Sequence, residues 1–318
     1  MQLTLNPEKA NWNFRIGRRT LDRMTLRGIH VPLITPFRAD GAIATDALAD
    51  LADAALEAGA AGLVALGTTA EVATLGVGER TEVVDVCARI CRERDASLII
   101  GAGGNDTAAT LRALEELGTW PEARAALVTV PSFTRPGEAG VRAHFAHLAE
   151  HSPIPLVIYH IPYRTGQALS GASLRELGGL PGIVGVKYAA GGVDAATIDL
   201  FADLPADFEV LVGDDLYLGP LLAMGAHGGI LASAHLATAA FVDLLDAWQR
   251  ADLPRARHLG NNLARLSAAL FTEPNPTVIK GVLHATGRIP TPDVRLPLLP
   301  AGDESVDNAL KLLADLGG

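Results

Sequence analysis

Aromatic side chains are scarce in this 318-residue chain: Phe, Trp and Tyr together make up 5%, whereas apolar residues make up 49%. A core with few aromatic rings has to be built from small aliphatic side chains, which suits packed layers of helix and sheet and disfavours an all-β sandwich. The apolar share and a mean hydropathy of +0.25 also exclude a disordered polymer. The length allows one large domain or two ordinary ones.

Positive charge is also in deficit. The chain has 26 Lys and Arg residues against 36 Asp and Glu residues, which gives a formal charge of −10 and a pI near 5.3. Such a chain has the wrong sign of electrostatic field to attract a polyanion, so we expect no nucleic-acid partner.

Cysteine occurs only twice, at Cys87 and Cys91. The two residues lie four positions apart in a stretch of helical pattern, and no second pair is present to complete a zinc site. We expect both to be reduced side chains in or beside the core, and we expect neither a cofactor nor a metal ion.

The sequence also lacks a secretory signal and a convincing membrane span. Residues 1–26 carry four arginines but no apolar run, so we expect an N-terminal extension of a cytoplasmic protein. Leu216–Val242 contains no Asp, Glu, Lys or Arg and is longer than the ~20 residues of a spanning helix. Pro220 and several glycines interrupt it, so we divide it into helix, buried strand, turn and helix and expect no membrane partner.

From residue 28 onward, short apolar runs alternate with longer stretches of helical period. The runs are Ile29–Ile34, Gly62–Leu66, Leu98–Gly101, Ala125–Val130, Pro155–Tyr159, Ile183–Val186, Glu209–Val212 and Gly229–Leu231. The helical stretches lie near 45–58, 79–93, 107–118, 138–151, 172–178, 193–203, 216–224 and 239–251, and Thr45, Asp106 and Ser170 are start signals for three of them.

Apolar strands that are each followed by a helix indicate parallel pairing with helices outside the sheet. Eight such units predict a (β/α)₈ barrel over residues 27–252. A doubly wound sheet usually has a Gly-rich phosphate turn after its first strand, but here Ile29–Ile34 leads into Thr35-Pro36-Phe37. Residues 253–318 predict a C-terminal helical segment with helices near 254–271, 276–286 and 304–316.

Lysine is rare, and one lysine has an unusual position. The four lysines are at positions 9, 187, 280 and 311, and only Lys187 closes an apolar strand. Functional groups of a barrel project from the carboxyl ends of its strands. A lysine with a pKa near 10.4 is neutral in about one molecule in 2,500 at pH 7, and burial lowers that pKa by up to ~3–5 units. Lys187 is therefore a candidate to form an imine with a ketone. An ion pair at the barrel mouth is the alternative.

Groups that imine chemistry needs lie at the ends of nearby strands. Tyr159 closes the fifth predicted strand and is a candidate proton shuttle for the carbinolamine. Thr68 and Thr69 follow the second strand and, with the backbone amides of their turn, are candidates to bind the carboxylate of a keto acid.

These residues and their surroundings resemble the dihydrodipicolinate synthase and N-acetylneuraminate lyase family of Schiff-base barrels. The similarity runs from about residue 28 to residue 300. The matching motifs are Val31–Phe37, Gly67–Glu71, Gly101–Asn105, Tyr159–Gly166, Gly185–Lys187, Gly213–Asp215 and Asn275–Pro276.

The resemblance implies a role for each matching site residue. Lys187 condenses with pyruvate or a related 2-oxo acid, and Tyr159 moves protons to and from the adduct together with Thr68. Thr68 and Thr69 hold the keto-acid carboxylate. Arg164 matches the arginine that grips the carboxylate of a second substrate, aspartate semialdehyde. The resemblance further implies that Gly213 and Ile230 line the pocket through their carbonyls, that Asp214 and Asp215 are structural, and that the protein is a homotetramer.

Three positions depart from the family pattern. Phe133 stands where the synthases have a tyrosine that reaches across a subunit interface and completes a relay with Tyr159 and Thr68. Ala70 replaces a glycine, which predicts crowding or altered backbone angles in the turn. His160 replaces an asparagine and adds a titratable group near the site.

Three functions remain open at this stage. The retained Arg164 favours the 4-hydroxy-tetrahydrodipicolinate synthase reaction of lysine biosynthesis. The loss of the tyrosine at Phe133 favours an aldolase or dehydratase that acts on 2-keto-3-deoxy acids or 4-hydroxy-2-oxo acids. A non-catalytic member that binds keto acids is the third possibility.

One further cluster of side chains is typical of a metal site. His144, His147 and His151 lie on one face of a predicted helix, a spacing that a metal ion can use. Solvated histidines on an outer helix are the more common explanation, and we prefer it.

Overall fold

Residues 25–316 are described by the structure, a computed structural model of the chain. The expected N-terminal extension, residues 1–26, lies outside the described residues except for its last two positions. Of these two, Leu26 is buried.

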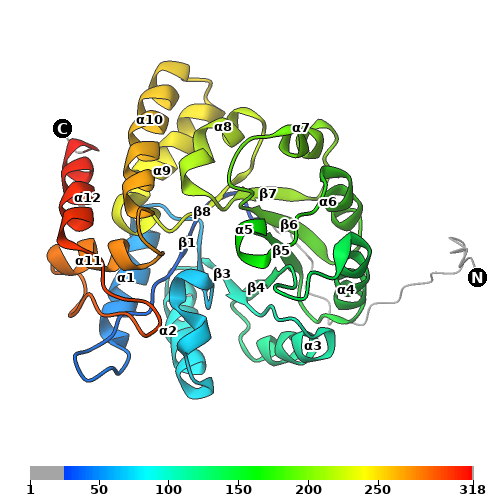
Figure 1. The fold of residues 1–318 in the computed structure, drawn as a ribbon, viewed down its shortest axis with the longest axis horizontal. Helices are drawn as coiled ribbons and strands as arrows, with labels where there is room; N and C mark the ends of the chain where they lie inside the picture. Colours follow the sequence, from blue (N-terminus) through cyan, green and yellow to red (C-terminus); the bar gives the residue numbers. More distant parts are fainter. Residues whose placement is uncertain (1–24, 317–318) are drawn as a thin grey trace, which may run out of the picture.

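Parallel strands close into a barrel in which each strand pairs with the next along the chain and the last pairs with the first (Figure 1). The prediction of a (β/α)₈ barrel is therefore confirmed. Each predicted strand agrees with the observed one to within two residues at either end. The strands are β1 (Gly28–Pro32), β2 (Gly62–Ala65), β3 (Ser97–Gly101), β4 (Ala123–Thr129), β5 (Leu156–His160), β6 (Ile183–Tyr188), β7 (Glu209–Val212) and β8 (Gly228–Ile230).

Helices surround the barrel, as Figure 1 shows. They are α1 (Thr45–Glu57), α2 (Val77–Glu93), α3 (Thr107–Glu116), α4 (Gly137–His151), α5 (Pro162–Thr165), α6 (Gly171–Gly178), α7 (Ala195–Ala202), α8 (Leu218–Ala223) and α9 (Ala234–Gln249). Asp106 and Ser170 cap α3 and α6 with their side chains as predicted, because these accept hydrogen bonds from amides of the first turn. The prediction for Thr45 is wrong: it is the first helical residue, and Ala44 precedes it without a side-chain cap.

The strands separate two apolar cores. Residues that point outward pack against the helices, and residues that point inward fill the barrel. The inner core includes Val64, Ile99, Leu127, Val157 and Leu211, which come from five different strands. Successive side chains of a strand point to opposite faces, so the core to which a residue belongs shows whether it faces the barrel interior.

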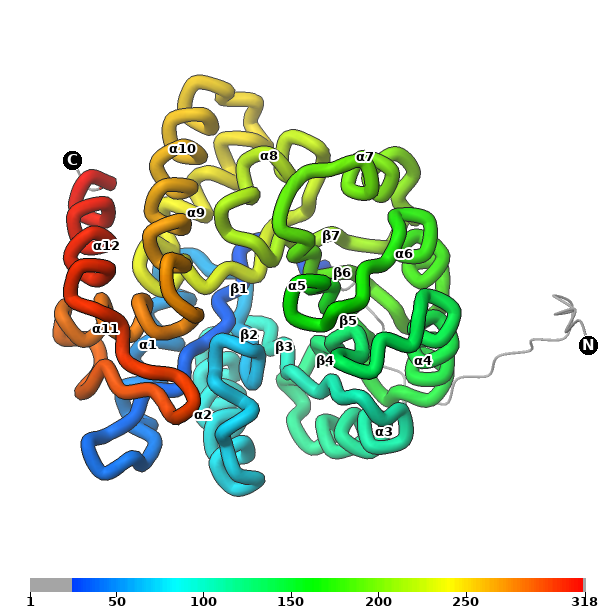
Figure 2. Tube along the Cα trace, in the orientation of Figure 1, coloured from blue at the N-terminus to red at the C-terminus, as the bar shows by residue number. Residues whose placement is uncertain are grey.

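Three helices follow the barrel and lie on one side of it (Figure 2). They are α10 (Leu253–Leu270), α11 (Thr277–Ala285) and α12 (Asp303–Leu316), close to the predicted positions. Helix α10 packs against α9, and α12 packs against α10 and α11. This segment reaches the barrel mouth, where it contributes to the pocket described below.

The uncharged stretch Leu216–Val242 divides into α8, β8 and α9, as predicted. None of the helices in residues 25–316 is both long enough and apolar enough to cross a membrane. Cys87 and Cys91 are buried free thiols of α2, which confirms that they are core residues. Burial raises the pKa of Cys91 to about 12, so this thiol is a poor nucleophile.

Candidate active site

Lys187 and Tyr159 occupy directly paired positions on β6 and β5. Val186 and Tyr188 belong to the outer core, so Lys187, which lies between them on the strand, points into the barrel. Tyr159 belongs to the inner core. The Nζ atom of Lys187 lies 4.3 Å from the centre of the Tyr159 ring. These two side chains are predicted from the sequence at neighbouring strand ends, and the structure brings them together.

The surroundings of Lys187 favour its neutral form. The side chain is only 4% exposed, and burial lowers its pKa to about 8, although the nearby carboxylates Asp215 and Asp214 oppose the shift. At a pKa of 8, about one amine in ten is neutral at pH 7, against about one in 2,500 for an exposed lysine. Burial raises the pKa of the Tyr159 phenol to about 12, so Tyr159 is present as the protonated acid.

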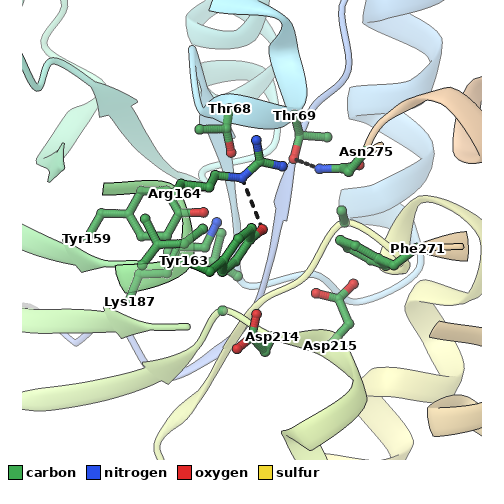
Figure 3. A pocket seen from close by; sticks show the side chains of 14 residues that line it. Thr68, Thr69, Tyr159, Tyr163, Arg164, Lys187, Asp214, Asp215, Phe271 and Asn275 are labelled. Atoms are coloured by element: carbon green, nitrogen blue, oxygen red, sulfur yellow. Dashed lines mark hydrogen bonds between the residues drawn. The ribbon is translucent and has the colours of Figure 1, made fainter. Parts of the chain in front are cut away.

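A pocket opens beside these two residues at the carboxyl ends of the strands (Figure 3). Its lining comes from several strands, from α5 and from the C-terminal segment. The lining residues are Thr68, Thr69, Tyr159, Ile161, Tyr163, Arg164, Lys187, Gly213, Asp214, Asp215, Ile230, Ala232, Phe271 and Asn275. Every residue that sequence analysis proposed for the site is therefore in this pocket.

Gly213 leaves room for the lysine. A Cβ atom at position 213 would lie 2.8 Å from Cγ of Lys187, closer than real Cβ contacts come. The absence of a side chain at Gly213 therefore allows the lysine stem to run along the end of β7 toward the pocket.

Asp214 and Asp215 form the acidic side of the pocket. Asp214 accepts a hydrogen bond of 2.6 Å from the amide of Gly191, and Asp215 accepts one of 2.6 Å from the amide of Ser233. Burial raises the pKa of Asp215 to about 6, which the hydrogen bond from Ser233 opposes. These bonds tie the loops after β6 and β8 to the loop after β7, which supports the structural role inferred for the two carboxylates.

The threonine turn after β2 is a short 3₁₀ helix over Thr68–Ala70. The side-chain amide of Asn275 donates a hydrogen bond of 2.9 Å to the hydroxyl of Thr69 (Figure 3). The Thr35 hydroxyl donates a hydrogen bond of 2.8 Å to the carbonyl of Ala70. Ala70 fits here because the left-handed backbone conformation, with φ of 56°, falls on Glu71 instead. The predicted altered backbone angle is thus not at Ala70.

A buried ion pair holds Glu71. Its carboxylate accepts a hydrogen bond of 2.6 Å from Nζ of Lys280 and one of 2.8 Å from the amide of Arg295. Lys280 is fully buried, donates to the carbonyl of Asp293 at 2.7 Å and lies 4.1 Å from the centre of the Phe37 ring. The C-terminal segment therefore fixes the residue that follows the threonine turn.

Helix α5 carries Arg164 to the mouth of the pocket. Nε of Arg164 donates a hydrogen bond of 3.0 Å to the phenol oxygen of Tyr163, and its guanidinium carbon lies 5.3 Å from the centre of that ring. Both side chains are exposed. Because Nε is occupied, the two terminal nitrogens remain to bind a carboxylate side by side.

Phe133 lies outside the pocket lining. Its side chain is 91% exposed, its φ is 62°, and its amide donates a hydrogen bond of 3.1 Å to the carbonyl of Thr165 in α5. A phenylalanine in the left-handed region is uncommon and strained. Within one chain, Phe133 supplies nothing to the site.

His160 points away from the pocket. It is buried on the outer side of β5, with its ring stacked on Tyr188 at a centroid distance of 5.5 Å. Burial lowers its pKa to about 4, so it is neutral at pH 7. The prediction that His160 adds a titratable group near the site is wrong, because consecutive strand residues face opposite sides.

The three histidines of α4 do not form a cluster. His144 is buried, and its Nδ1 lies 2.9 Å from the hydroxyl of Thr107. His147 and His151 are exposed and pack their rings together with centroids 4.4 Å apart. Across residues 25–316, no three His, Cys, Asp or Glu side chains are grouped in a way that would hold a metal ion.

Five lining residues have no role predicted from the sequence, namely Ile161, Tyr163, Ala232, Phe271 and Asn275. Tyr163 lies within one of the matching motifs, and the four-residue helix that turns it into the pocket is not predicted by the sequence pattern. Phe271 comes from the end of α10, which was expected to belong to an appendage. The signal for Tyr163 was its position between Tyr159 and Arg164.

Comparisons with known proteins agree on one family. The model of the dihydrodipicolinate synthetase family matches residues 25–316. The chain is 37% identical over 294 residues to the 4-hydroxy-tetrahydrodipicolinate synthase of Neisseria meningitidis serogroup B, which covers 92% of this chain and 100% of the relative.

Solved structures show the same similarity. The chloride-inhibited dihydrodipicolinate synthase from Acinetobacter baumannii, complexed with pyruvate, is 32% identical with a TM-score of 0.86, over 92% of this chain and 99% of that one. The dihydrodipicolinate synthase from Thermotoga maritima is 30% identical with a TM-score of 0.86, over 92% and 98% of the two chains.

Proposed function

The chain belongs to the dihydrodipicolinate synthetase family, and from this we propose that it is a lyase of the class I aldolase type that condenses pyruvate with an aldehyde through an imine on Lys187. The observation that carries the proposal is a buried lysine with a pKa of about 8, paired across two strands with a buried tyrosine and opening onto a pocket. A lysine of this kind is poised for nucleophilic attack.

The first step is the binding of pyruvate. Thr68 and Thr69 hold its carboxylate, and Asn275 orients the Thr69 hydroxyl by donating to its oxygen. Since the Thr69 oxygen accepts this bond, its own hydrogen is free to be donated to the carboxylate. Gly213 and Ile230 complete the wall next to the lysine.

Imine formation follows. The nitrogen lone pair of Lys187 forms the bond to C2 of pyruvate, and the carbonyl pair moves to oxygen, which takes a proton while the nitrogen gives one up to form the carbinolamine. We assign the donation of this proton to Tyr159, because the lysine nitrogen lies 4.3 Å from the centre of its ring. Loss of water from the carbinolamine then gives the imine, and removal of a C3 proton gives the enamine that attacks the aldehyde.

Arg164 is the residue that binds the second substrate, the aldehyde. Its side chain is exposed and lines the same pocket as the buried lysine, and its terminal nitrogens suit a carboxylate. An aldehyde that carries a carboxylate, such as L-aspartate semialdehyde, is therefore the preferred partner. This choice corresponds to the 4-hydroxy-tetrahydrodipicolinate synthase reaction of lysine biosynthesis.

The second candidate is aldol cleavage or dehydration of 2-keto-3-deoxy acids or 4-hydroxy-2-oxo acids. Phe133 favours it, because a side chain without a hydroxyl cannot complete a tyrosine relay.

A cytoplasmic location and a homotetramer also remain predictions, and the exposed Phe133 is the side chain that we expect at an interface between subunits. Sedimentation velocity of the purified protein tests the tetramer.

Product analysis tests the proposal. The protein is incubated with pyruvate and L-aspartate semialdehyde, and in parallel with 4-hydroxy-2-oxo acids, and products are identified by mass spectrometry. Consumption of the semialdehyde with formation of the cyclic condensation product supports the synthase reaction. Release of pyruvate from the hydroxy-oxo acids with no condensation would instead establish the aldolase.

A further inference from the structure

Hydroxyl groups of the pocket differ in their access to water. Of the lining residues in the described part of the chain, Thr68, Thr69, Tyr159 and Tyr163 carry a hydroxyl. Tyr159 is 4% exposed, whereas Tyr163 is 63% exposed. Tyr163 therefore lines the pocket with one part of its side chain and contacts solvent with another, which suits a group that gives up a proton in the pocket and recovers one from water.

The contact with Arg164 fixes the orientation of the Tyr163 hydroxyl. The phenol oxygen accepts the hydrogen bond of 3.0 Å from Nε of Arg164, so its own hydrogen is directed elsewhere (Figure 3). A positive charge beside the phenol oxygen also stabilises the phenolate that proton donation leaves behind. In Figure 3 the Tyr163 ring lies among Lys187, Arg164 and Asp214, inside the ring of lining side chains.

The condensation requires an acid at this end of the pocket. When the enamine attacks the aldehyde, its C2=C3 pair forms the new carbon–carbon bond, and the nitrogen pair re-forms the imine. The carbonyl pair of the aldehyde moves to oxygen, which needs one proton. An aldehyde whose carboxylate is bound by Arg164 and whose carbonyl carbon faces the enamine on Lys187 lies beside Tyr163, because Tyr163 contacts Arg164 and lines the same pocket.

We propose that Tyr163 is the general acid that protonates the aldehyde oxygen, a catalytic role distinct from that of Tyr159. The inference rests on the proposed function, because it concerns the second half of that reaction. The Tyr163 O–H bond breaks as the O–H bond of the product forms, and the resulting phenolate, paired with Arg164, takes a proton from water. Tyr159 serves the imine, since it lies over Lys187 and is shielded from solvent.

The variant Tyr163→Phe removes only the hydroxyl. Its ring remains available to Arg164, and because the residue is exposed the core is untouched. We expect the variant to form the borohydride-trapped pyruvate adduct as the wild type does. We also expect it to exchange the methyl protons of pyruvate with deuterium oxide at the wild-type rate, because imine and enamine formation do not use Tyr163. The kcat for condensation should fall at least ~100-fold, the size of a general-acid effect.

Tyr188→Phe is the matched control. It makes the same chemical change one residue after Lys187, but the Tyr188 hydroxyl lies on the outer side of β6, 3.0 Å from that of Thr197. This variant should keep kcat within about threefold, since its hydroxyl cannot reach the pocket. Circular dichroism verifies that both variants are folded.

The condensation assay uses L-aspartate semialdehyde and glyoxylate as the aldehydes, and each of its outcomes supports or overturns the role of Tyr163 as the general acid. A Tyr163→Phe variant with unchanged kcat would overturn the inference, as would one in which only KM for the aldehyde rises, since that marks a positioning effect on Arg164. Loss of deuterium exchange would also overturn it, because Tyr163 would then act on the enamine. If the wild type traps pyruvate but condenses neither aldehyde, the inference falls together with the proposed function.

Discussion

Lys187 and Tyr159 face each other across two adjacent strands, with the amine nitrogen 4.3 Å from the centre of the aromatic ring. The ring face and the two nearby carboxylates favour the charged amine, whereas burial favours the neutral one, and burial is the larger effect. The resulting pKa of about 8 makes the amine available near neutral pH.

The rate of imine formation should therefore depend on pH through Lys187. Attack needs the neutral amine, so the rate with pyruvate should rise about tenfold per pH unit below pH 8 and level off above it. Stopped-flow or quenched borohydride trapping between pH 6 and pH 10 measures this profile. A rate that still rises at pH 10 would mean that the lysine keeps an ordinary pKa.

Arg164→Lys should weaken the binding of the aldehyde but not that of pyruvate. A lysine keeps the charge but cannot present two parallel donors, and a lost hydrogen bond to a charged group costs about 1.5–3 kcal/mol. We expect KM for L-aspartate semialdehyde to rise by about 10–100-fold. Propanal, which has no carboxylate, is the control substrate, and its KM should not change. An equal rise in KM for both aldehydes would contradict the role of Arg164 as the group that binds the carboxylate of the aldehyde.

Phe133→Tyr should raise the rate of the synthase reaction if the missing hydroxyl limits proton transfer. The substitution is on an exposed side chain, so it leaves the fold unchanged. Steady-state assays of the variant and of the wild type give the comparison. An unchanged kcat would show that Phe133 is not the obstacle and that the hydroxyls of a single chain are enough.

Lys280→Met should destabilise the protein by about 3–5 kcal/mol, because it leaves the buried carboxylate of Glu71 without its cation. The double variant Glu71→Gln/Lys280→Met should recover part of this loss, since no charge then remains unpaired. Urea unfolding measures both.

Asp243→Asn is the control for the buried pair, because it breaks the partly exposed ion pair with Arg255 and should cost ~1 kcal/mol or less. If Lys280→Met and Asp243→Asn lowered the free energy of unfolding by the same amount, the buried pair between Lys280 and Glu71 would stabilise the fold no more than an exposed pair does.

The sequence was sufficient to predict features that depend on local pattern. Apolar runs gave the strands, and a lysine at the end of an apolar strand identified Lys187. Tyr159 and Lys187 were expected at the ends of neighbouring strands, and they are directly paired there. The alternation of side chains along a strand, applied to His160, would have placed it on the outer face.

Contacts between distant parts of the chain could not be predicted in this way. Asn275 meets Thr69 across 206 residues, and Lys280 meets Glu71 across 209. These contacts depend on how the C-terminal segment packs onto the loops after β1 and β2, about which periodicity carries no information. Tyr163 was missed for a related reason: its orientation depends on the single helical turn of α5.

Borohydride reduction in the presence of pyruvate tests the imine most directly. Peptide mapping by mass spectrometry should find the mass of pyruvate, less one water and plus two hydrogens, on Lys187 of the wild type, and no adduct on any lysine of Lys187→Met. A wild-type protein that stays unmodified over a range of 2-oxo acids, or an adduct carried by a different lysine, would contradict the assignment of Lys187 as the nucleophile.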